Sequence, residues 1–384
     1  MCHFLLHQHQ LHRNILPPKN QRDRAVILNA KHPMILNHNT KASQGASIEA
    51  QPPIRWRLTV TWLSFGSLMI LTLLIAPLIG PTSITLSSVI DRSLPFVENV
   101  DAQIFFIARL PRALTGALVG ASLAAAGVVF QALLRNPLAT PYTLGISAGS
   151  SLGAMLVITF GAPVLASVIP ALPLASFLGS LMAAGVVYAL ATLRHRDLST
   201  MVLLLAGVTI NSFFTSVIMF VQYLNDFTQT FQTVRWLMGN LDVSGYQPIL
   251  AALPFTLIAF IGFAWLPKSL NLLTLGVDSA ASRGVNVLRT QRLAFLTASL
   301  ATAAAVSLSG PIGFIGIVIP HLVRLLVGAD HRIVMPASAC LGASFLVACD
   351  VVARTVMAPL ELPVGIITAL IGGPFFLWLL VRRQ

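Results

Sequence analysis

The chain has 384 residues, of which 56% are hydrophobic and only 9% charged, and its formal net charge is +12. Soluble domains carry about 25% Asp, Glu, Lys and Arg, so this composition and a mean hydropathy of +0.82 exclude an aqueous globule. The basic residues are scattered between long apolar runs, which argues against a nucleic-acid partner. The composition therefore predicts an all-α, polytopic membrane protein.

Residues 1–54 do not share this pattern, because they are polar and hold six of the nine histidines. We expect a disordered N-terminal extension here. One alternative is a metal site formed by closely spaced histidines, namely His3, His7, His9 and His12. Another is that translation begins at Met34, so that residues 1–33 are not made.

Residues 55–384 are expected to form the membrane domain, because they contain ten segments near the length of about 20 residues that a bilayer span needs. Clusters of Pro and Gly divide the longest apolar runs. The predicted spans are 58–79, 112–134, 143–161, 172–193, 200–223, 247–267, 293–311, 313–328, 334–355 and 361–381. The span at 313–328 is expected to be short or to end in its own polar residues, His321 and Arg324.

The distribution of Lys and Arg predicts the orientation, because these residues favour the cytoplasmic side of a membrane. Ten spans with both termini in the cytoplasm leave only five of the 24 outside: Arg92, Arg109, Arg112, Arg235 and Arg354. The chain is therefore predicted to be a multi-pass protein of the inner (plasma) membrane, in contact with lipid.

Small residues recur at four-residue spacing in two of the predicted spans. They are Gly116 and Gly120 in the second span, and Gly145, Gly149 and Gly153 in the third. This spacing places small residues on one helix face, where two backbones can approach closely. The glycines are thus predicted to pack helices, as a general packing face or with a more specific role.

Three of the arginines assigned to the outside, Arg109, Arg112 and Arg354, lie at span ends. Long basic side chains can extend to the membrane interface, and Asp350 lies one helical turn before Arg354 as an intramolecular partner. Alternatively, the three form a basic ring that docks an acidic extracytoplasmic protein. Their spacing leaves both interpretations open.

The loop 268–292 is the longest predicted on the cytoplasmic side. Its apolar residues and glycines are Leu272, Leu273, Leu275, Gly276, Ala280, Ala281 and Gly284. This pattern predicts two short amphipathic helices joined by a turn. Such a loop lies on the membrane surface or enters the groove of a partner protein.

The sequence lacks the motifs of several enzyme classes. No lysine follows glycine as a phosphate-binding loop requires, and no His-Glu-x-x-His pattern occurs. The cysteines, Cys2, Cys340 and Cys349, have no metal-ligand spacing. We therefore expect no catalytic residue, metal site or cofactor. An ion-coupled carrier would place ionisable groups along its path, and Asp350 is the one acidic residue expected inside a span.

Ordered motifs from about residue 60 to the C-terminus make the chain similar to a known family. They include Arg109-Leu110-Pro111-Arg112, then GALVGASLAAAGVVFQALLRNPLATPYTLGISAGSSLGA, LLLAG at 203–207, WLMGNL at 236–241, LNLLTLGVDSAASRGV, GPIGFIGIVIPHLVRLLVGADHR, DVVAR at 350–354 and ELPVGIITALIGGPFFLWLL. These resemble the FecCD-type permeases of bacterial ATP-driven importers for iron-siderophore complexes, haem and cobalamin. Asn240 stands where the family commonly has Ser.

The resemblance implies ten spans and a non-catalytic permease that works with two cytoplasmic ATP-binding subunits and a second permease subunit, as a homodimer or a pair. It further implies that the stretch 271–287 enters the ATPase cleft, which favours the partner-groove interpretation. The arginines Arg109, Arg112 and Arg354 would face an acidic substrate-binding protein. The expected cargo is a ferric siderophore; cobalamin or haem is the alternative within the family, and an ion-coupled secondary carrier is the alternative from another class.

Overall fold

The described part of the chain is built from helices, with no strand among residues 53–91, 95–161, 170–193, 199–243 and 245–382 of the computed structural model. These residues belong to one folded unit, Pro52–Gln384. The expectation of disorder for residues 1–54 falls almost entirely outside the described residues. The all-α prediction is confirmed for the part of the chain that the structure describes.

Long apolar helices coincide with the ten predicted spans. Seven of them are long and apolar enough to cross a membrane: Ile54–Leu78 (α1 with the 3-10 turn η1), Val100–Leu133 (α3, the π-helical turn η2 and α4), Ala171–Thr192 (α6), Thr200–Tyr223 (α7), Gln247–Trp265 (α9), Val287–Ser309 (α12) and His331–Thr355 (α14). Three shorter apolar helices fill the remaining positions: Ile146–Phe160 (α5), Ile315–Val327 (α13) and Val364–Arg382 (α15). The number of crossings and the side of each terminus stay predictions.

Helix α13 has 13 residues, which at 1.5 Å per residue is about 20 Å, against about 30 Å of hydrocarbon. The prediction that this segment is short is confirmed. It follows a sharp turn in which Phe314 adopts a left-handed backbone conformation with φ of 68°. The turn lets α12 and α13 follow one another within few residues.

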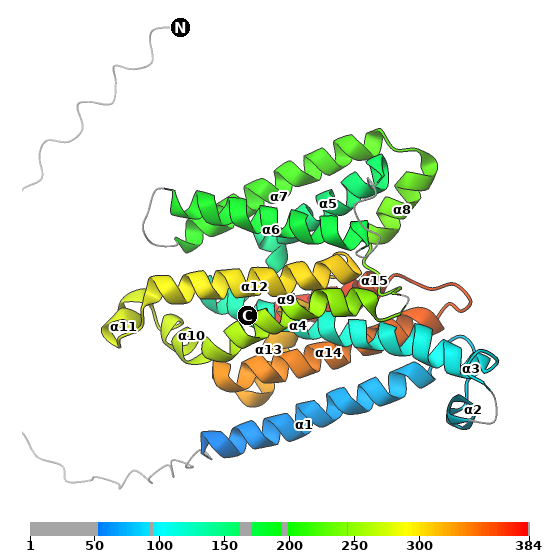
Figure 1. Cartoon of the computed structure of the whole chain (residues 1–384). Coiled ribbons are helices and arrows are strands. Elements are labelled where there is room, and N and C mark those ends of the chain that lie inside the picture. The colour runs from blue at the N-terminus through cyan, green and yellow to red at the C-terminus, as the bar shows by residue number, and fades with distance from the viewer. Residues whose placement is uncertain (1–52, 92–94, 162–169, 194–198, 244, 383–384) are drawn as a thin grey trace, which may run out of the picture. The chain divides into compact units, whose positions relative to one another are not determined.

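Helix α4 (Leu110–Leu133) is the central element. It contacts α12, α13 and α14, and most of its residues are buried, with Val119 and Ala124 fully inaccessible. Helices α5, α6 and α7 pack together on one side of α12, whereas α1 packs against α14 (Figure 1). The core therefore lies around α4, which is enclosed by its neighbours over most of its length.

Glycines on α4 allow its neighbours to approach closely. A Cβ added to Gly120 would overlap the carbonyl oxygen of Gly342 on α14, and one added to Gly127 would overlap that of Gly316 on α13. Because association within a bilayer depends on close packing rather than on the hydrophobic effect, these backbone contacts are an important source of attraction between the helices.

Short helices lie at the two ends of the bundle. Helices α10 (Pro267–Leu273) and α11 (Val277–Ser282) are at one end, and α2 (Leu86–Ile90) and α3 (Val100–Gln103) are at the opposite end (Figure 1). Helix α8 (Phe227–Leu237) was not predicted from the sequence. Its first turn is fixed by a capping box, in which the side chains of Asp226 and Gln229 each accept from the other's backbone N–H.

Candidate functional site

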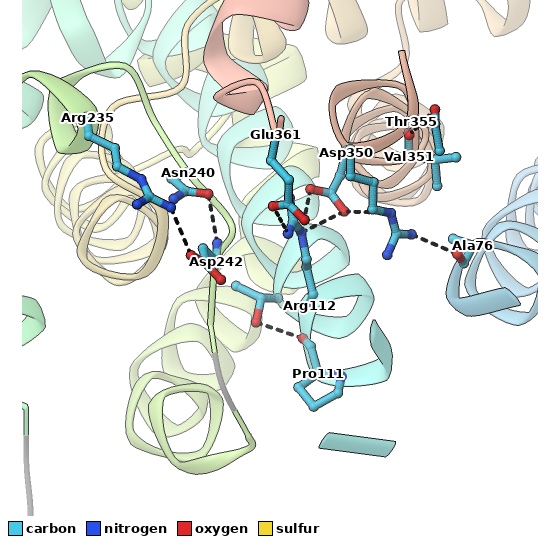
Figure 2. Close-up of polar contacts among 12 residues, drawn as sticks. Ala76, Pro111, Arg112, Arg235, Asn240, Asp242, Asp350, Val351, Thr355 and Glu361 are labelled. Atoms are coloured by element: carbon cyan, nitrogen blue, oxygen red, sulfur yellow. Dashed lines mark hydrogen bonds and ion pairs between the residues drawn. The ribbon is translucent and has the colours of Figure 1, made fainter. Parts of the chain in front are cut away.

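A buried charge cluster joins the start of α4 to the end of α14. The Nε of Arg112 donates to both carboxylate oxygens of Asp350, at 2.9 and 3.1 Å. Its Nη1 donates to Oε2 of Glu361 at 2.6 Å. Figure 2 shows Arg112 held between the two acids. The Asp350 side chain is 1% exposed and that of Glu361 is 40% exposed, so Arg112 has one deep and one accessible partner.

Arg354 completes this cluster from the same helix as Asp350. Its Nε lies 3.7 Å from Oδ2 of Asp350, one helical turn away, and its Nη2 donates to the carbonyl of Ala76 at 2.7 Å. A buried charge is costly unless it is paired and hydrogen-bonded. The two acids thus offset the charges of the two arginines, and the cluster connects α1, α4 and α14 at one end of the bundle.

Arg109 lies nearby but is satisfied differently. It ends the π-helical turn η2 (Ile104–Arg109) and donates to the backbone carbonyls of Pro77 and Leu78, and to both oxygens of Thr82. A Cβ on Gly80 would overlap its guanidinium, so the segment after α1 wraps tightly around this side chain. Arg109 therefore fixes the segment that follows α1.

All three arginines predicted to dock an external protein are buried within the chain, with 2 to 8% of each residue exposed. A direct ion pair with a partner requires one of these internal contacts to open. The structure does bring Arg109, Arg112 and Arg354 to one end of the bundle, but it pairs Arg112 and Arg354 with Asp350. The docking role stays a prediction. The contribution of Glu361 was missed, because no sequence signal linked it to Arg112.

The predicted loop at 268–292 contains the two expected short helices, α10 and α11. Leu270, Leu273 and Ala280 are buried and attach the loop to the bundle, whereas Leu275 is 61% exposed at the turn between the helices. Leu272 and Gly276 are half-buried, and Ala281 and Gly284 are exposed. Both glycines have positive φ, 121° and 81°, which only glycine adopts without strain. The exposed tip is available to a partner.

Asn271 of α10 binds the beginning of α14. Its Nδ2 donates to Oδ1 of Asp330 at 2.8 Å, and its Oδ1 accepts from the backbone N–H of His331 at 2.9 Å. The same oxygen lies 2.6 Å from Nδ1 of His331. Asp330 is also the N-cap of α14 and accepts from the backbone N–H of Arg332. One amide thus holds the loop to the first turn of a long helix.

Hydrogen bonds stabilise the ionised form of Asp330. Burial acts to raise the pKa of this carboxyl, but hydrogen bonds from Arg332 and Asn271 outweigh it and lower the pKa to about 2. Asp330 therefore stays ionised throughout the physiological pH range. Its carboxylate therefore accepts hydrogen bonds from Asn271 and from the backbone N–H of Arg332 throughout that pH range.

The remaining predicted glycines lie in two settings. A Cβ on Gly149 would overlap Gly179 and Ala183 of α6, and one on Gly153 would overlap the carbonyl of Ala175. A Cβ added to Gly116 would lie 3.2 Å from side-chain atoms of both Leu241 and Val347, which leaves little room. Gly145 instead precedes α5 and has a φ of 73°, so it shapes the turn from the 3-10 helix η3 (Pro141–Leu144). The specific functional role of the glycines stays a prediction.

A hollow of about 390 Å³ lies beside α8. Arg235 of α8 and Asp242 both line it and pair at 3.1 Å, and the side-chain oxygen of Asn240 accepts from the backbone N–H of Asp242 (Figure 2). The same hollow is lined by Ser307 and Ser309 at the end of α12. Asn240, which departs from the usual family residue, thus orders the turn after α8.

Comparisons with known proteins agree with this architecture. A profile of the FecCD transport family matches residues 68–382. The hemin transport permease of Yersinia pestis is 38% identical over 326 residues, covering 84% of this chain and 96% of that protein. The cobalamin import permease of Halobacterium salinarum is 45% identical over 276 residues, covering 72% and 73%.

A solved structure is also similar. It is described as an inward-facing conformation of a metal-chelate-type ABC transporter, and it is 32% identical with a TM-score of 0.73, covering 85% of this chain and 99% of that one. The apolar helices and these matches indicate a multi-pass helical protein of the inner membrane. The chain belongs to the FecCD transport family, a family of ABC transporter permease subunits that are not themselves catalytic.

Proposed function

We propose that this chain is the permease subunit of an ATP-driven importer that carries ferric siderophore complexes into the cytoplasm. The match to the FecCD transport family over residues 68–382 is the observation that carries the proposal. Relatives support an iron chelate as cargo: the Fe(3+)-citrate import permease of Bacillus subtilis is 38% identical over 276 residues, and the metal-chelate-type transporter shares the fold.

Cobalamin is the second candidate, because the cobalamin import permease has the higher identity, 45% over 276 residues. Haem is a third, through the hemin permease. Competition between labelled ferric siderophore, cobalamin and haem for uptake by cells with and without this chain would separate them. We expect loss of the chain to abolish siderophore uptake. Loss of cobalamin uptake alone would instead identify cobalamin as the cargo.

Partners follow from this function. We infer two cytoplasmic ATP-binding subunits, an extracytoplasmic substrate-binding protein and a second permease subunit, as a homodimer. The exposed tip of the loop 268–292, called the coupling loop from here on, supports the first of these, because Leu275 presents apolar surface at the turn that Gly276 shapes. A helix-and-turn projection of this kind suits a groove on a soluble partner.

We propose that the binding protein docks at Arg112, where one of its carboxylates takes the place of the carboxylate of Glu361. Its contact with Asp350 is buried, whereas its contact with Glu361 is accessible. An acidic group of the partner would therefore replace Glu361 on Nη1 and leave the inner pair intact. Charge complementarity of this kind sets specificity and association rate, and it does not require three arginines to be exposed in the free chain.

An ion-coupled carrier is the rival from another class. Asp350 is a weak candidate for its ion site, because this carboxylate is already bound by Arg112 and flanked by Arg354. Reconstitution separates the two classes. Vesicles containing the permease and its ATP-binding subunits should accumulate chelate only with ATP, whereas uphill uptake driven by an ion gradient with this chain alone would overturn the proposed function.

A further inference from the structure

Helix α14 touches both functional regions of the chain. Its first residue, His331, contacts Asn271 of the coupling loop, and Asp350 near its other end contacts Arg112. His331 and Asp350 are 19 positions apart, which corresponds to about 28 Å of helix at 1.5 Å per residue. One continuous helix thus joins the loop at one end of the bundle to the charge cluster at the other.

The helix between these contacts is held firmly. Ala337, Leu346 and Val347 are all at most 1% exposed, and Gly342 meets Gly120 of α4 backbone to backbone. Pro336 interrupts the backbone hydrogen bonding once, near the loop end. Val334 before it and Ala337 after it are both buried, so the surrounding packing supports the helix on both sides of the proline.

The coupling loop is attached to the start of α14 by hydrogen bonds as well as by apolar packing. Asn271 has both a donor and an acceptor bonded to α14, at 2.8 and 2.9 Å, and Leu270 and Leu273 beside it are buried. Hydrogen bonds to a charged group are stronger than those between neutral groups. Asn271 bonds both to the ionised N-cap residue Asp330 and to the next residue, so displacement of α10 carries the start of α14 with it.

We propose that Asn271 is the positioning residue through which movement of the coupling loop is passed to α14, and thereby to Asp350 and the charge cluster. The inference rests on the proposed function, since it takes the loop to be the contact of the ATP-binding subunits. Coupling between two sites is reciprocal. Docking at Arg112 should therefore alter ATP hydrolysis through the same helix, and loss of the Asn271 contacts should weaken that effect.

The test compares variants of the assembled transporter, reconstituted with ATP-binding subunits and binding protein. Asn271→Asp places a carboxylate against Asp330 and breaks the amide contact. Asn136→Asp is the matched control: it adds the same charge on the same predicted side of the membrane, outside the coupling loop, and keeps the oxygen that accepts from the backbone N–H of Leu138.

The measured quantity is the factor by which binding protein stimulates ATP hydrolysis, together with chelate transported per ATP. Both are ratios, so a merely structural loss of assembled protein does not change them. We expect N271D to lower the stimulation factor at least about fivefold and N136D to leave it within about twofold. Asn271→Ala, which adds no charge, should also lower it.

Unchanged stimulation in N271D and N271A, or an equal loss of stimulation in N136D, would overturn the role of Asn271. These outcomes are distinct from failure of the proposed function. In that case the wild-type assembly itself would show no ATP-dependent uptake and no response to binding protein.

Discussion

Arg112 and Asp350 are 238 positions apart in the sequence and meet through two hydrogen bonds at the end of the bundle. The pair ties the first turn of α4 to the last turns of α14. With Arg354 one turn further along, the single buried carboxylate is shared by two guanidinium groups. The charge cluster is thus a structural joint as well as the candidate docking region.

Replacing Asp350 by Asn should destabilise the protein strongly. The substitution leaves Arg112 and Arg354 buried with their main anionic partner gone, and breaking a buried pair in this way typically costs about 3–5 kcal/mol. Thermal unfolding of the detergent-solubilised protein measures the effect. Asp242→Asn is the control, because the Arg235–Asp242 pair is more than half exposed and such pairs contribute about 0–1 kcal/mol. Equal effects of the two substitutions would contradict this account.

Glu361→Gln should strengthen docking of the binding protein. The substitution removes the negative charge that competes for Nη1 of Arg112 while the Asp350 contact remains. We expect about three- to tenfold tighter binding, a change of about 1 kcal/mol typical of an accessible ion pair, measured with the permease in nanodiscs. Glu98→Gln, an exposed acid just before α3, is the control. Weaker binding by the Glu361 variant would mean that Glu361 assists docking instead.

Enlarging Gly120 should disrupt the contact between α4 and α14. A methyl group at this position would overlap the carbonyl oxygen of Gly342, a backbone atom that cannot rotate away. Overpacking of this kind costs about 1–3 kcal/mol, and thermal unfolding of Gly120→Ala measures it. Gly66→Ala on α1 is the matched control, because nothing lies near its Cβ position. That control should be neutral, and a neutral Gly120→Ala would refute the close crossing.

Cysteine labelling checks the predicted orientation. A cysteine replacing Leu275, which is 61% exposed at the loop tip, should react with a membrane-impermeant maleimide only from the cytoplasmic side. A cysteine replacing Val97, which is 82% exposed before α3, should react only from the outside. Cys340 and Cys349 are buried and give little background, and Cys2 is first replaced by Ser. Labelling of both positions from one side would invalidate the assignment of Lys- and Arg-rich loops to the cytoplasm.

Much of the helical architecture was predictable from apolar segment length. All ten predicted spans coincide with helices, because a bilayer demands long apolar segments and Pro and Gly divide them. The helix α8 was missed, since only 11 residues form it and it is polar on one side. Its Asp226 and Gln229, three positions apart, were the available signal.

The candidate site was harder to predict. The sequence places Arg354 one turn after Asp350, which made that pair foreseeable, but no local pattern connects Arg112 with Asp350 or Asn271 with Asp330. Such contacts depend on which helices become neighbours, and a single sequence does not encode that in its periodicity. Burial of the arginines was unexpected for the same reason, because charge spacing alone says nothing about what covers a side chain.

The enclosure of α4 has a consequence for motion. At Gly120 and Gly127 the backbone of the helix lies directly against the backbone of Gly342 and of Gly316. Backbone contacts of this kind resist small rotations and axial shifts of a helix less than interdigitated side chains do. They still hold the helices close together. The outer helices can thus change their tilt relative to α4 while the contacts at the centre of the bundle are kept.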